Sequence, residues 1–382
     1  MSITLESALA AAGIADREPI QVLRDGFPSL VVRVSTSFFG GRRSIIVKAC
    51  PVSSREPDVL VCLHQIGLPV PAVLDVREGN GFRVIIMEDV GADALHKHPD
   101  AEWYKAAVRE IARIHKQSQL SSRSSCLPGG FRAALADLVP TYDDAKWAAI
   151  VREGLEGTLR RIDDGTYGTY GPRAASGTDS RGQARDREEL PDVLSDLAEK
   201  TLAMIHDLSA CWPSSHMPSA CRPFSNVIVH GDYHDGNILI RASESGNVVA
   251  QQPPHHFAIV DWDGARWDSG FFDLVSLFDV SERMRTFRLD PEEIMGTYLG
   301  TYASIYSDTY ADAHQHTYVD PHQAPYRLET HPDDPIVCGA EAEWRRCRVL
   351  RAWDELRWFS ETGEDFGGRI VREIGIIRSH VG

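Results

Sequence analysis

The fold of this chain is decided by one stretch of its sequence, Val227-Ile-Val-His-Gly-Asp-Tyr-His-Asp-Gly-Asn-Ile-Leu-Ile240. An apolar strand runs into His-Gly-Asp, and Asn237, five residues after Asp232, opens a second apolar strand. After a polar hairpin, a third apolar strand runs into Asp261 in the stretch Phe257-Ala-Ile-Val-Asp-Trp-Asp-Gly264. Two acidic groups and an amide thus stand beside apolar strands, which hold functional side chains more rigidly than loops do.

These residue types suit phosphoryl transfer from ATP. The reaction needs a carboxylate that accepts the proton of the acceptor hydroxyl and oxygen ligands that hold Mg²⁺ against the phosphates. Asp232 can be the base, and Asn237 and Asp261 can be the magnesium ligands. The five-residue step from Asp232 to Asn237 lets one loop present both groups to one γ-phosphate. Asp263 is either a second ligand or a hydrogen-bond acceptor behind the first one, and the sequence leaves both interpretations open.

The same motifs carry a resemblance to a known family. His230-Gly-Asp-x-His-x-x-Asn237 resembles the catalytic loop of the aminoglycoside phosphotransferase and choline kinase family, which shares the protein-kinase fold. Val260-Asp-Trp-Asp263 resembles its metal-binding motif, and Trp267–Val275 resembles the segment that follows. In that segment Asp273 is expected to be structural. The family's Gly-Asp-Pro-like turn is replaced here by Asp268-Ser-Gly270.

The N-terminal part of the chain extends the resemblance, which covers residues 20–280. Lys48 ends the strand Ser44-Ile-Ile-Val-Lys, where the family has its phosphate-binding lysine, and Glu56 is placed to pair with it. Met87-Glu-Asp-Val-Gly91 resembles the hinge of the family. By this resemblance, the backbone of Glu88 and Val90 is expected to bind adenine.

The contacts of three further residues are expectations of the same kind. Residues 25–31 correspond to the nucleotide-positioning loop, in which Ser29 is expected to reach a phosphate, although this loop has a single glycine. His230 is expected to orient the catalytic loop by hydrogen bonding. His234 either touches a phosphate or packs. The chain has no GxxxxGK[ST] motif, which excludes a P-loop as the phosphate-binding device.

The order of the patterns predicts a mainly β N-terminal lobe followed by a larger, mainly α lobe, and the resemblance implies an α+β, protein-kinase-like bilobal fold. An N-terminal nucleotide-binding lobe over residues 1–90 is expected to hold about five antiparallel strands and one main helix, by the strand and helix patterns of this part. A hinge is expected at residues 88–92, and a larger, mainly α lobe for catalysis and acceptor binding at 91–382. Residues 163–188 and 305–335 are expected to be irregular insertions, and a strong helix near the end of the chain is expected at 344–359.

The charge and composition of the chain limit the kinds of ligand and the compartment that we expect. The net charge of −15 argues against a nucleic-acid ligand and is compatible with a cationic small molecule. No apolar run approaches the ~20 residues of a membrane span. The segment Met1–Ile14 lacks the basic residues of a secretion signal, so the cytoplasm is the expected compartment. The seven cysteines form no CxxC pair, so neither a disulfide framework nor a zinc site is expected.

Taken together, the resemblance implies an ATP- and Mg²⁺-dependent O-phosphotransferase. Its acceptor would be a hydroxyl of a small molecule such as an aminoglycoside-like or other natural-product antibiotic, which would make the protein a resistance enzyme. The alternatives are a kinase of choline, ethanolamine or a sugar, and a nucleotide-binding pseudokinase. A protein kinase is disfavoured because Gly231 replaces the arginine of His-Arg-Asp and no Ala-Pro-Glu follows. The acceptor, the choice of ATP or GTP and the oligomeric state stay open.

Overall fold

The computed structural model describes most of the chain. The described residues are 3–14, 19–25, 29–36, 43–98, 100–121, 131–164, 180–211, 226–241, 257–280, 289–313, 335–362 and 369–381. They form two compact units: the first is Met1–Pro140, Asn226–Trp267 and Ser276–Gln323, and the second is Thr141–Ser225, Asp268–Val275 and Ala324–Gly382. The expected lobe boundary at residues 88–92 falls inside the first unit and stays a prediction.

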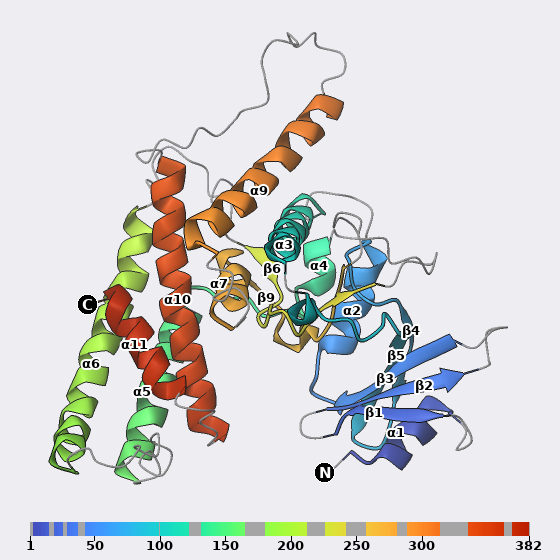
Figure 1. The fold of residues 1–382 in the computed structure, drawn as a ribbon, viewed down its shortest axis with the longest axis horizontal. Helices are drawn as coiled ribbons and strands as arrows, with labels where there is room; N and C mark the ends of the chain where they lie inside the picture. The colour runs from blue at the N-terminus through green and yellow to red at the C-terminus, as the bar shows by residue number, and fades with distance from the viewer. Residues whose placement is uncertain are drawn as a thin grey trace. The chain divides into compact units, whose positions relative to one another are not determined.

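An antiparallel sheet of five strands forms the N-terminal part of the first unit (Figure 1). Its strand order is β1-β2-β3-β5-β4. The strands are β1 (Ile20–Arg24), β2 (Leu30–Thr36), β3 (Arg43–Pro51), β4 (Val73–Glu78) and β5 (Phe82–Glu88). The expected α+β architecture, with this sheet and a mostly helical remainder, is confirmed.

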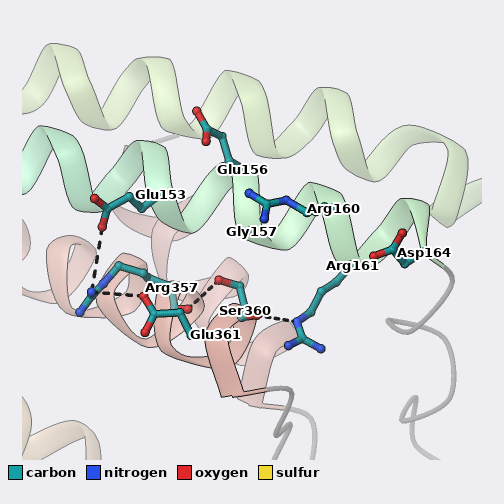
Figure 2. A pocket seen from close by; sticks show the side chains of 9 residues that line it. All are labelled: Glu153, Glu156, Gly157, Arg160, Arg161, Asp164, Arg357, Ser360 and Glu361. Atoms are coloured by element: carbon teal, nitrogen blue, oxygen red, sulfur yellow. Dashed lines mark hydrogen bonds and ion pairs between the residues drawn. The ribbon is translucent and has the colours of Figure 1, made fainter.

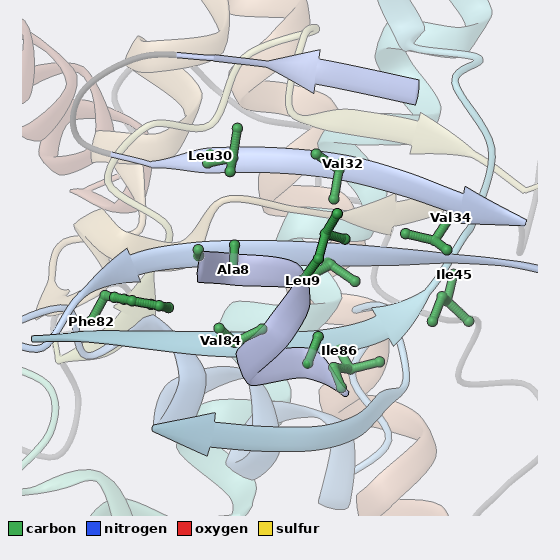
Figure 3. Packing of buried hydrophobic residues seen from close by; sticks show 12 residues of the cluster. Ala8, Leu9, Leu30, Val32, Val34, Ile45, Phe82, Val84 and Ile86 are labelled. Atoms are coloured by element: carbon green, nitrogen blue, oxygen red, sulfur yellow. The ribbon is translucent and has the colours of Figure 1, made fainter. Parts of the chain in front are cut away.

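One face of the sheet packs against the first helix, α1 (Leu5–Ala12) (Figure 3). Alternate residues of a strand point to one face, and Leu30, Val32 and Val34 of β2 are accordingly all buried in this cluster. Thr4 caps α1 by accepting a hydrogen bond from the backbone of Ser7, which fixes where the helix starts. The opposite face of the sheet is therefore left for the site.

The helix α2 (Glu56–Gln65) follows β3. Pro57 lies in its first turn, where a missing N–H costs nothing, and Asp58 there complements the positive end of the helix dipole. Asp58 also accepts two hydrogen bonds from Arg83 of β5, at 2.6 and 2.8 Å. This pair holds the start of α2, and with it Glu56, against the sheet.

The rest of the first unit is helical around short strands. Its helices and strands are η1 (Leu95–Lys97), α3 (Ala101–Ser121), α4 (Phe131–Leu135), β6 (Val227–Val229), β7 (Ile238–Ile240), β8 (Phe257–Ile259), η4 (Trp262–Gly264), β9 (Arg266–Asp268) and α9 (Pro291–Ala313). β7 pairs with β8, and β6 with β9. α9 packs on α3, where His115 Nδ1 lies 2.9 Å from the hydroxyl of Tyr298. These short strands carry the motif residues.

The second unit is a set of packed helices. They are α5 (Asp144–Asp163), α6 (Ser180–Cys211), α10 (Pro335–Thr362) and α11 (Arg369–Val381), and α7 (Phe271–Val280) begins in this unit. Trp353 of α10 is fully buried and donates through Nε1 to the Thr201 hydroxyl of α6 at 3.0 Å. A Cβ on Gly154 of α5 would lie 3.0 Å from the Trp353 carbonyl oxygen, so α5 and α10 approach closely because this residue is glycine.

Three expectations about the insertions and the last helix are corrected. Residues 180–188 belong to α6 and 305–313 to α9, and α10 begins at Pro335, earlier than expected. The segment 180–188 is polar but contains arginine, glutamine and glutamate, which favour helices, so polarity alone did not indicate a loop. Residue 163 is the last of α5, and residues 165–179 and 314–334 of the two expected insertions lie outside the described residues. In the described part of the chain, every helix is too short or too polar to cross a membrane.

Candidate active site

A buried lysine joins three elements of the first unit. Lys48 of β3 is 6% exposed, and its Nζ lies 2.6 Å from Glu56 Oε2 of α2 and 2.5 Å from Asp261 Oδ1 after β8. The expected pairing of Lys48 with Glu56 is therefore present. Burial lowers the pKa of Lys48, but the two carboxylates outweigh it and the net shift is upward. Lys48 consequently stays charged between them.

The two carboxylates differ in their titration. Burial raises the pKa of Glu56 to about 7, although Lys48 acts against the rise. The partial burial of Asp261, whose side chain is 30% exposed, acts to raise its pKa, but the charge and hydrogen bond of Lys48 prevail and lower it. Asp261 thus remains an anion at neutral pH, as a metal ligand must.

The β7–β8 hairpin brings the two expected magnesium ligands to the same end of a strand pair. Ile238 lies opposite Ile259, so Asn237 precedes one strand just where Asp261 follows the other. The Val260 N–H donates to the Asn237 carbonyl oxygen at 3.0 Å and closes this end. Asp261 itself has φ 67° and ψ 57°, a left-handed conformation that non-glycine residues rarely adopt. Such conformations persist where surrounding structure enforces them, commonly at functional sites.

The expected base, Asp232, is held near the same place. Asn237 Nδ2 donates to the Asp232 carbonyl oxygen at 3.0 Å and to its Oδ2 at 3.3 Å. Both of these hydrogen bonds use the Nδ2 atom of Asn237. The amide oxygen takes part in neither of them and is suited to binding a hard cation. The side chain of Asp232 is 52% exposed, so a substrate hydroxyl can approach it.

His230 supports the loop by hydrogen bonding, as expected. Its ring is fully buried; Nδ1 accepts from the Asp232 N–H at 3.2 Å, and Nε2 lies 2.8 Å from the Val260 carbonyl oxygen. A single tautomer, with hydrogen on Nε2, satisfies both contacts. The ring therefore connects the segment of the base to the segment that precedes Asp261.

Gly231 is required by the geometry of this loop. Its φ is 84°, and a Cβ there would lie 2.3 Å from the Gly264 carbonyl oxygen. Any other residue would meet both the left-handed strain and a backbone collision. The glycine of the His-Gly-Asp motif thus lets two backbone segments approach each other beside the base.

His234 faces the base. Its Nε2 lies 3.5 Å from Asp232 Oδ2, and its Nδ1 is 3.9 Å from Asp235 Oδ1. Burial lowers the pKa of His234, but these two carboxylates outweigh that effect and raise it to about 9. Tyr104 of α3 donates to the other oxygen of Asp235 at 2.9 Å. A series of side-chain contacts thus connects Tyr104 of α3, through Asp235 and His234, to the base Asp232. Tyr104 and Asp235 were not identified from the sequence.

The hinge is clamped by two arginines. Asp89, with 5% of its side chain exposed, accepts from Arg33 Nε at 2.6 Å and Nη2 at 3.0 Å, and from the Gly91 N–H at 3.0 Å. Glu88 pairs with Arg241 and accepts from the Ala72 N–H. These clamps hold the segment whose backbone is expected to bind adenine.

The backbone of the hinge limits how adenine can bind. The Glu88 N–H donates to the Ala72 carbonyl oxygen at 2.9 Å, so an adenine contact of Glu88 would come through its carbonyl oxygen. Val90 is 7% exposed. Ser29, expected at a phosphate, is 4% exposed, and residues 26–28 of its loop lie outside the described residues. The adenine and phosphate contacts of these residues stay predictions.

Two further residues touch the metal-binding motif. Ser54 donates through Oγ to Asp263 Oδ1 at 2.7 Å, which ties the residues before α2 to η4. Arg24, the last residue of β1, places Nη1 3.7 Å from Asp261 Oδ2. Neither Ser54 nor Arg24 was identified from the sequence, because both contacts join segments more than 200 residues apart. Whether Asp263 is a metal ligand stays open.

The donor set fits magnesium better than zinc. Within the described residues there is no cluster of three or more histidine, cysteine, aspartate or glutamate side chains able to hold a metal. Asp261 and the Asn237 amide offer hard oxygen ligands, and Mg²⁺ typically takes one or two protein carboxylates together with substrate phosphates and water. The residues present therefore fit a magnesium ion that is bound jointly with a nucleotide.

A pocket of about 560 Å³ lies in the second unit, between α5 and α10 (Figure 2). Arg357 contacts Glu361 at 3.4 Å and Glu153 at 4.0 Å, and Arg161 donates to the Ser360 carbonyl oxygen at 2.8 Å. Its lining includes four acidic and three basic side chains and none of the predicted site residues. The pocket and the Lys48 site therefore share no residue.

One known protein family matches most of the chain. The family model described as the phosphotransferase enzyme family matches residues 20–311. A search of the curated proteins finds no match to this sequence.

Several solved structures share the fold at low identity. A choline kinase from Cryptosporidium parvum aligns with TM-score 0.52 and 13% identity, over 95% of this chain and 88% of that one. Plasmodium vivax ethanolamine kinase aligns with TM-score 0.51 and 9% identity, over 96% and 82%. A thermostable mutant of aminoglycoside phosphotransferase APH(4)-Ia, in a ternary complex with AMP-PNP and hygromycin B, aligns with TM-score 0.50 and 14% identity, over 95% and 93%.

Proposed function

Because the chain belongs to the phosphotransferase enzyme family, we propose that it transfers the γ-phosphoryl group of ATP to a hydroxyl of a small molecule. The observation that carries this proposal is the cluster of buried Lys48 and Glu56 with partly buried Asp261, near the half-exposed Asp232. Phosphoryl transfer needs positioning and charge stabilisation more than covalent chemistry. A phosphate-binding cation, a metal-binding carboxylate and a base are the groups that supply them.

Each group has a stated task in this proposal. Lys48, held by Glu56, binds phosphate oxygens of ATP, and the hinge backbone at Glu88 and Val90 binds adenine. Asp261 and Asn237 hold Mg²⁺, which when bound neutralises charge on the phosphates. His234 and Ser29 are further proposed contacts of the phosphates. Half-buried Val31, Ile46 and the buried Met87 share the sheet face of Lys48 by their pairing and offer an apolar surface for the base.

The reaction balances with these residues. Asp232 accepts the proton of the acceptor hydroxyl as its oxygen attacks the γ-phosphorus. A new P–O bond forms to the acceptor, and the bond from the γ-phosphorus to the bridging oxygen breaks. The electron pair of that bond leaves with ADP. Asp232 then returns the proton to solvent, so that no phosphorylated enzyme is formed.

For the acceptor, we propose a cationic natural product such as an aminoglycoside-like antibiotic, which would make the chain a resistance enzyme. The net charge of −15 supports a cation, because an acidic field speeds its approach. Choline and ethanolamine are cations too, and the fold is shared with their kinases as well as with an aminoglycoside phosphotransferase. A kinase of choline, ethanolamine or a sugar is therefore the second candidate. A pseudokinase is disfavoured because Lys48, Asp232 and Asp261 are all present.

A mass-spectrometric acceptor screen tests the proposal. Purified protein with Mg²⁺ and ATP is incubated with pooled aminoglycosides, other antibiotics, choline, ethanolamine and sugars, and Asp232→Ala serves as the blank. We expect one compound to gain a single phosphoryl group with the intact protein only. A protein that binds no nucleotide would contradict the proposed function, and one that binds Mg-ATP without modifying any compound would favour a pseudokinase or an acceptor outside the panel.

A further inference from the structure

Arg24 lies outside every motif that the sequence analysis identified, yet it reaches the expected metal ligand. Its Nη1 is 3.7 Å from Asp261 Oδ2, while Lys48 Nζ contacts Oδ1 of the same carboxylate at 2.5 Å. Asp261 thus has a cation beside each of its oxygens. Lys48 has a second carboxylate, Glu56, at 2.6 Å, so it does not depend on Asp261 alone.

An irregularity in the sheet gives Arg24 this position. β1 pairs regularly with β2 as far as Val22, and the register then shifts so that Arg24 lies opposite Val31. Val31 lies opposite Lys48 on the next strand. Residues directly opposite each other in antiparallel strands present their side chains to one face. Arg24, Val31 and Lys48 therefore form a row across three strands on the same face.

With regular pairing, the side chain of Arg24 would lie on the face of the sheet opposite to Lys48. If the regular register continued past Val22, Leu23 would lie opposite Val31 and Arg24 opposite Leu30; the shift leaves Leu23 as the extra residue. Leu30 belongs to the cluster that packs against α1, on the opposite face. A β-bulge commonly re-aims a side chain in this way, and bulges are enriched beside active sites.

A metal on Asp261 would concentrate positive charge at this carboxylate. Lys48 and Arg24 already place two positive charges beside it. A divalent cation on Asp261 would add two positive charges next to Arg24. Repulsion between charges at a few ångströms is substantial in a half-buried site, and an anion that arrives with the metal offsets it. A polyphosphate meets this requirement.

The two cations differ in mobility. The side chain of Lys48 is 8% exposed and held between two carboxylates, whereas that of Arg24 is 50% exposed. Arg24 can therefore leave Asp261 without vacating a packed site. Its planar guanidinium, with five N–H donors, suits two phosphate oxygens at once better than an ammonium group does.

We propose that Arg24 is a polyphosphate-binding residue. It neutralises Asp261 in the nucleotide-free protein and moves its guanidinium to a β- or γ-phosphate oxygen when a magnesium nucleotide binds. This inference rests on the proposed function, to which it adds a residue and an exchange of partners. It also implies that affinity should depend on Arg24 for ligands with two or more phosphates and not for those with fewer.

Calorimetric titration tests this dependence. Adenosine, AMP, ADP and AMP-PNP, each with Mg²⁺, are titrated into wild type, Arg24→Gln and Arg24→Lys. We expect Arg24→Gln to weaken ADP and AMP-PNP binding about tenfold, the effect of one charge-assisted hydrogen bond, and to change adenosine and AMP binding less than about twofold. Arg24→Lys keeps the charge but loses the planar guanidinium. Its affinity for ADP and AMP-PNP should lie between those of wild type and Arg24→Gln.

A matched control is available on α3. Arg109 is 37% exposed and lies 3.5 Å from Glu102, so Arg109→Gln removes the same charge and a similarly long ion pair elsewhere. We expect it to bind all four ligands like wild type. Equal ADP affinity in Arg24→Gln and wild type would overturn the inference and leave the proposed function standing. Tighter ADP binding in Arg24→Gln would overturn it as well, since Arg24 would then only compete with the metal. Absence of nucleotide binding in wild type would instead overturn the proposed function.

Discussion

At the scale of single residues, the two key aspartates are held in different ways. Asp261 is paired with Lys48, which lowers its pKa and keeps it ionised as a ligand. Asp232 is half exposed and contacts Asn237 and His234, so it is oriented yet accessible. Ligand and base are thus separated by their surroundings, although both are carboxylates. Their substitution should therefore have different effects.

We expect Asp232→Asn to separate transfer from nucleotide binding. Removing a general base typically costs a factor of 10² to 10⁴ in rate, whereas Lys48 and Asp261, which are proposed to bind the nucleotide, stay unchanged. Turnover with the acceptor found by the screen should fall at least about 100-fold, and ADP affinity should stay within about twofold. Asp261→Asn is the comparison, because it should lose Mg-ADP affinity as well. Normal turnover in Asp232→Asn would show that another group is the base.

We expect Gly231→Ala to destabilise the protein more than Gly67→Ala. Both glycines have positive φ, 84° and 76°, so both variants carry left-handed strain of about 1 kcal/mol. A Cβ at Gly67 meets nothing within 4 Å, but one at Gly231 lies 2.3 Å from a backbone oxygen, which adds about 1–3 kcal/mol of overpacking. Denaturant unfolding measures both changes. Equal losses would mean that the catalytic loop moves aside at little cost.

At the scale of elements, hydrogen-bonded clamps position the segments of the site. The β7–β8 pairing aligns Asn237 with Asp261, and His230 ties the catalytic loop to the residue before Asp261. The hinge is held by arginines from β2 and from the end of β7. Since an arginine without its partner is left partly buried and uncompensated, the clamp at Asp89 should contribute to stability.

We expect Asp89→Asn to cost about 2 kcal/mol of unfolding free energy at pH 7, since Asp89 is buried and bound by Arg33 through two charge-assisted bonds. Burial raises the pKa of Asp89, but Arg33 and the other hydrogen bonds outweigh it, so its pKa is lowered. A lowered pKa contributes stability that is present at neutral pH and is lost as the pH falls through the folded value, below 3.8.

The difference between wild type and Asp89→Asn should therefore shrink as the pH falls below about 4. Asp75→Asn is the matched control. This variant makes the same chemical change in the ion pair of Asp75 with Arg77. The side chain of Arg77 is 42% exposed and that of Asp75 is 46% exposed. Exposed pairs contribute little, so this variant should unfold like wild type. A loss in Asp89→Asn that is independent of pH would indicate a packing effect instead of the ion pair.

At the scale of the whole molecule, all predicted nucleotide, metal and base residues lie in the first compact unit. The second unit, with α5, α6, α10 and α11, contains none of them and has its own pocket. Ligand binding protects the part of a protein that it contacts and stabilises. Because the predicted site residues lie in the first unit alone, a bound nucleotide should stabilise mainly that unit.

We expect Mg-ADP to slow amide hydrogen exchange mainly in the first unit. Protection should concentrate in β3, in residues 230–237 and around Asp261, because these segments carry the proposed contacts. Peptides from α5 and α10 should exchange as they do without ligand. Exchange mass spectrometry of the full chain measures this, and adenosine serves as a control that should protect the hinge more than residues 230–237. Protection confined to α5 and α10 would contradict the site assignment.

Much of the site was predictable because its motifs are local. The step from Asp232 to Asn237 and the strands on either side lie within one short stretch, so residue order alone brings them together. The antiparallel sheet was predictable from apolar runs separated by turns. The extent of α6 and α9 was not, because polar helices and polar loops have similar composition and only packing distinguishes them.

By itself, the sequence determined the order of the motif residues and a mainly β part followed by a mainly α part, because both depend on short spacings or on alternation within a strand. Its resemblance to a known family implied the kinase-like fold and the pairing of Lys48 with Glu56. Only the tertiary structure decided that Arg24 faces Asp261, that Tyr104 and Asp235 stand behind His234, and which arginines clamp the hinge. Those contacts depend on strand register, on one extra residue in β1 and on side chains that are far apart in the chain. A register shift of one residue reverses the face of a side chain, and no local pattern in the sequence marks it.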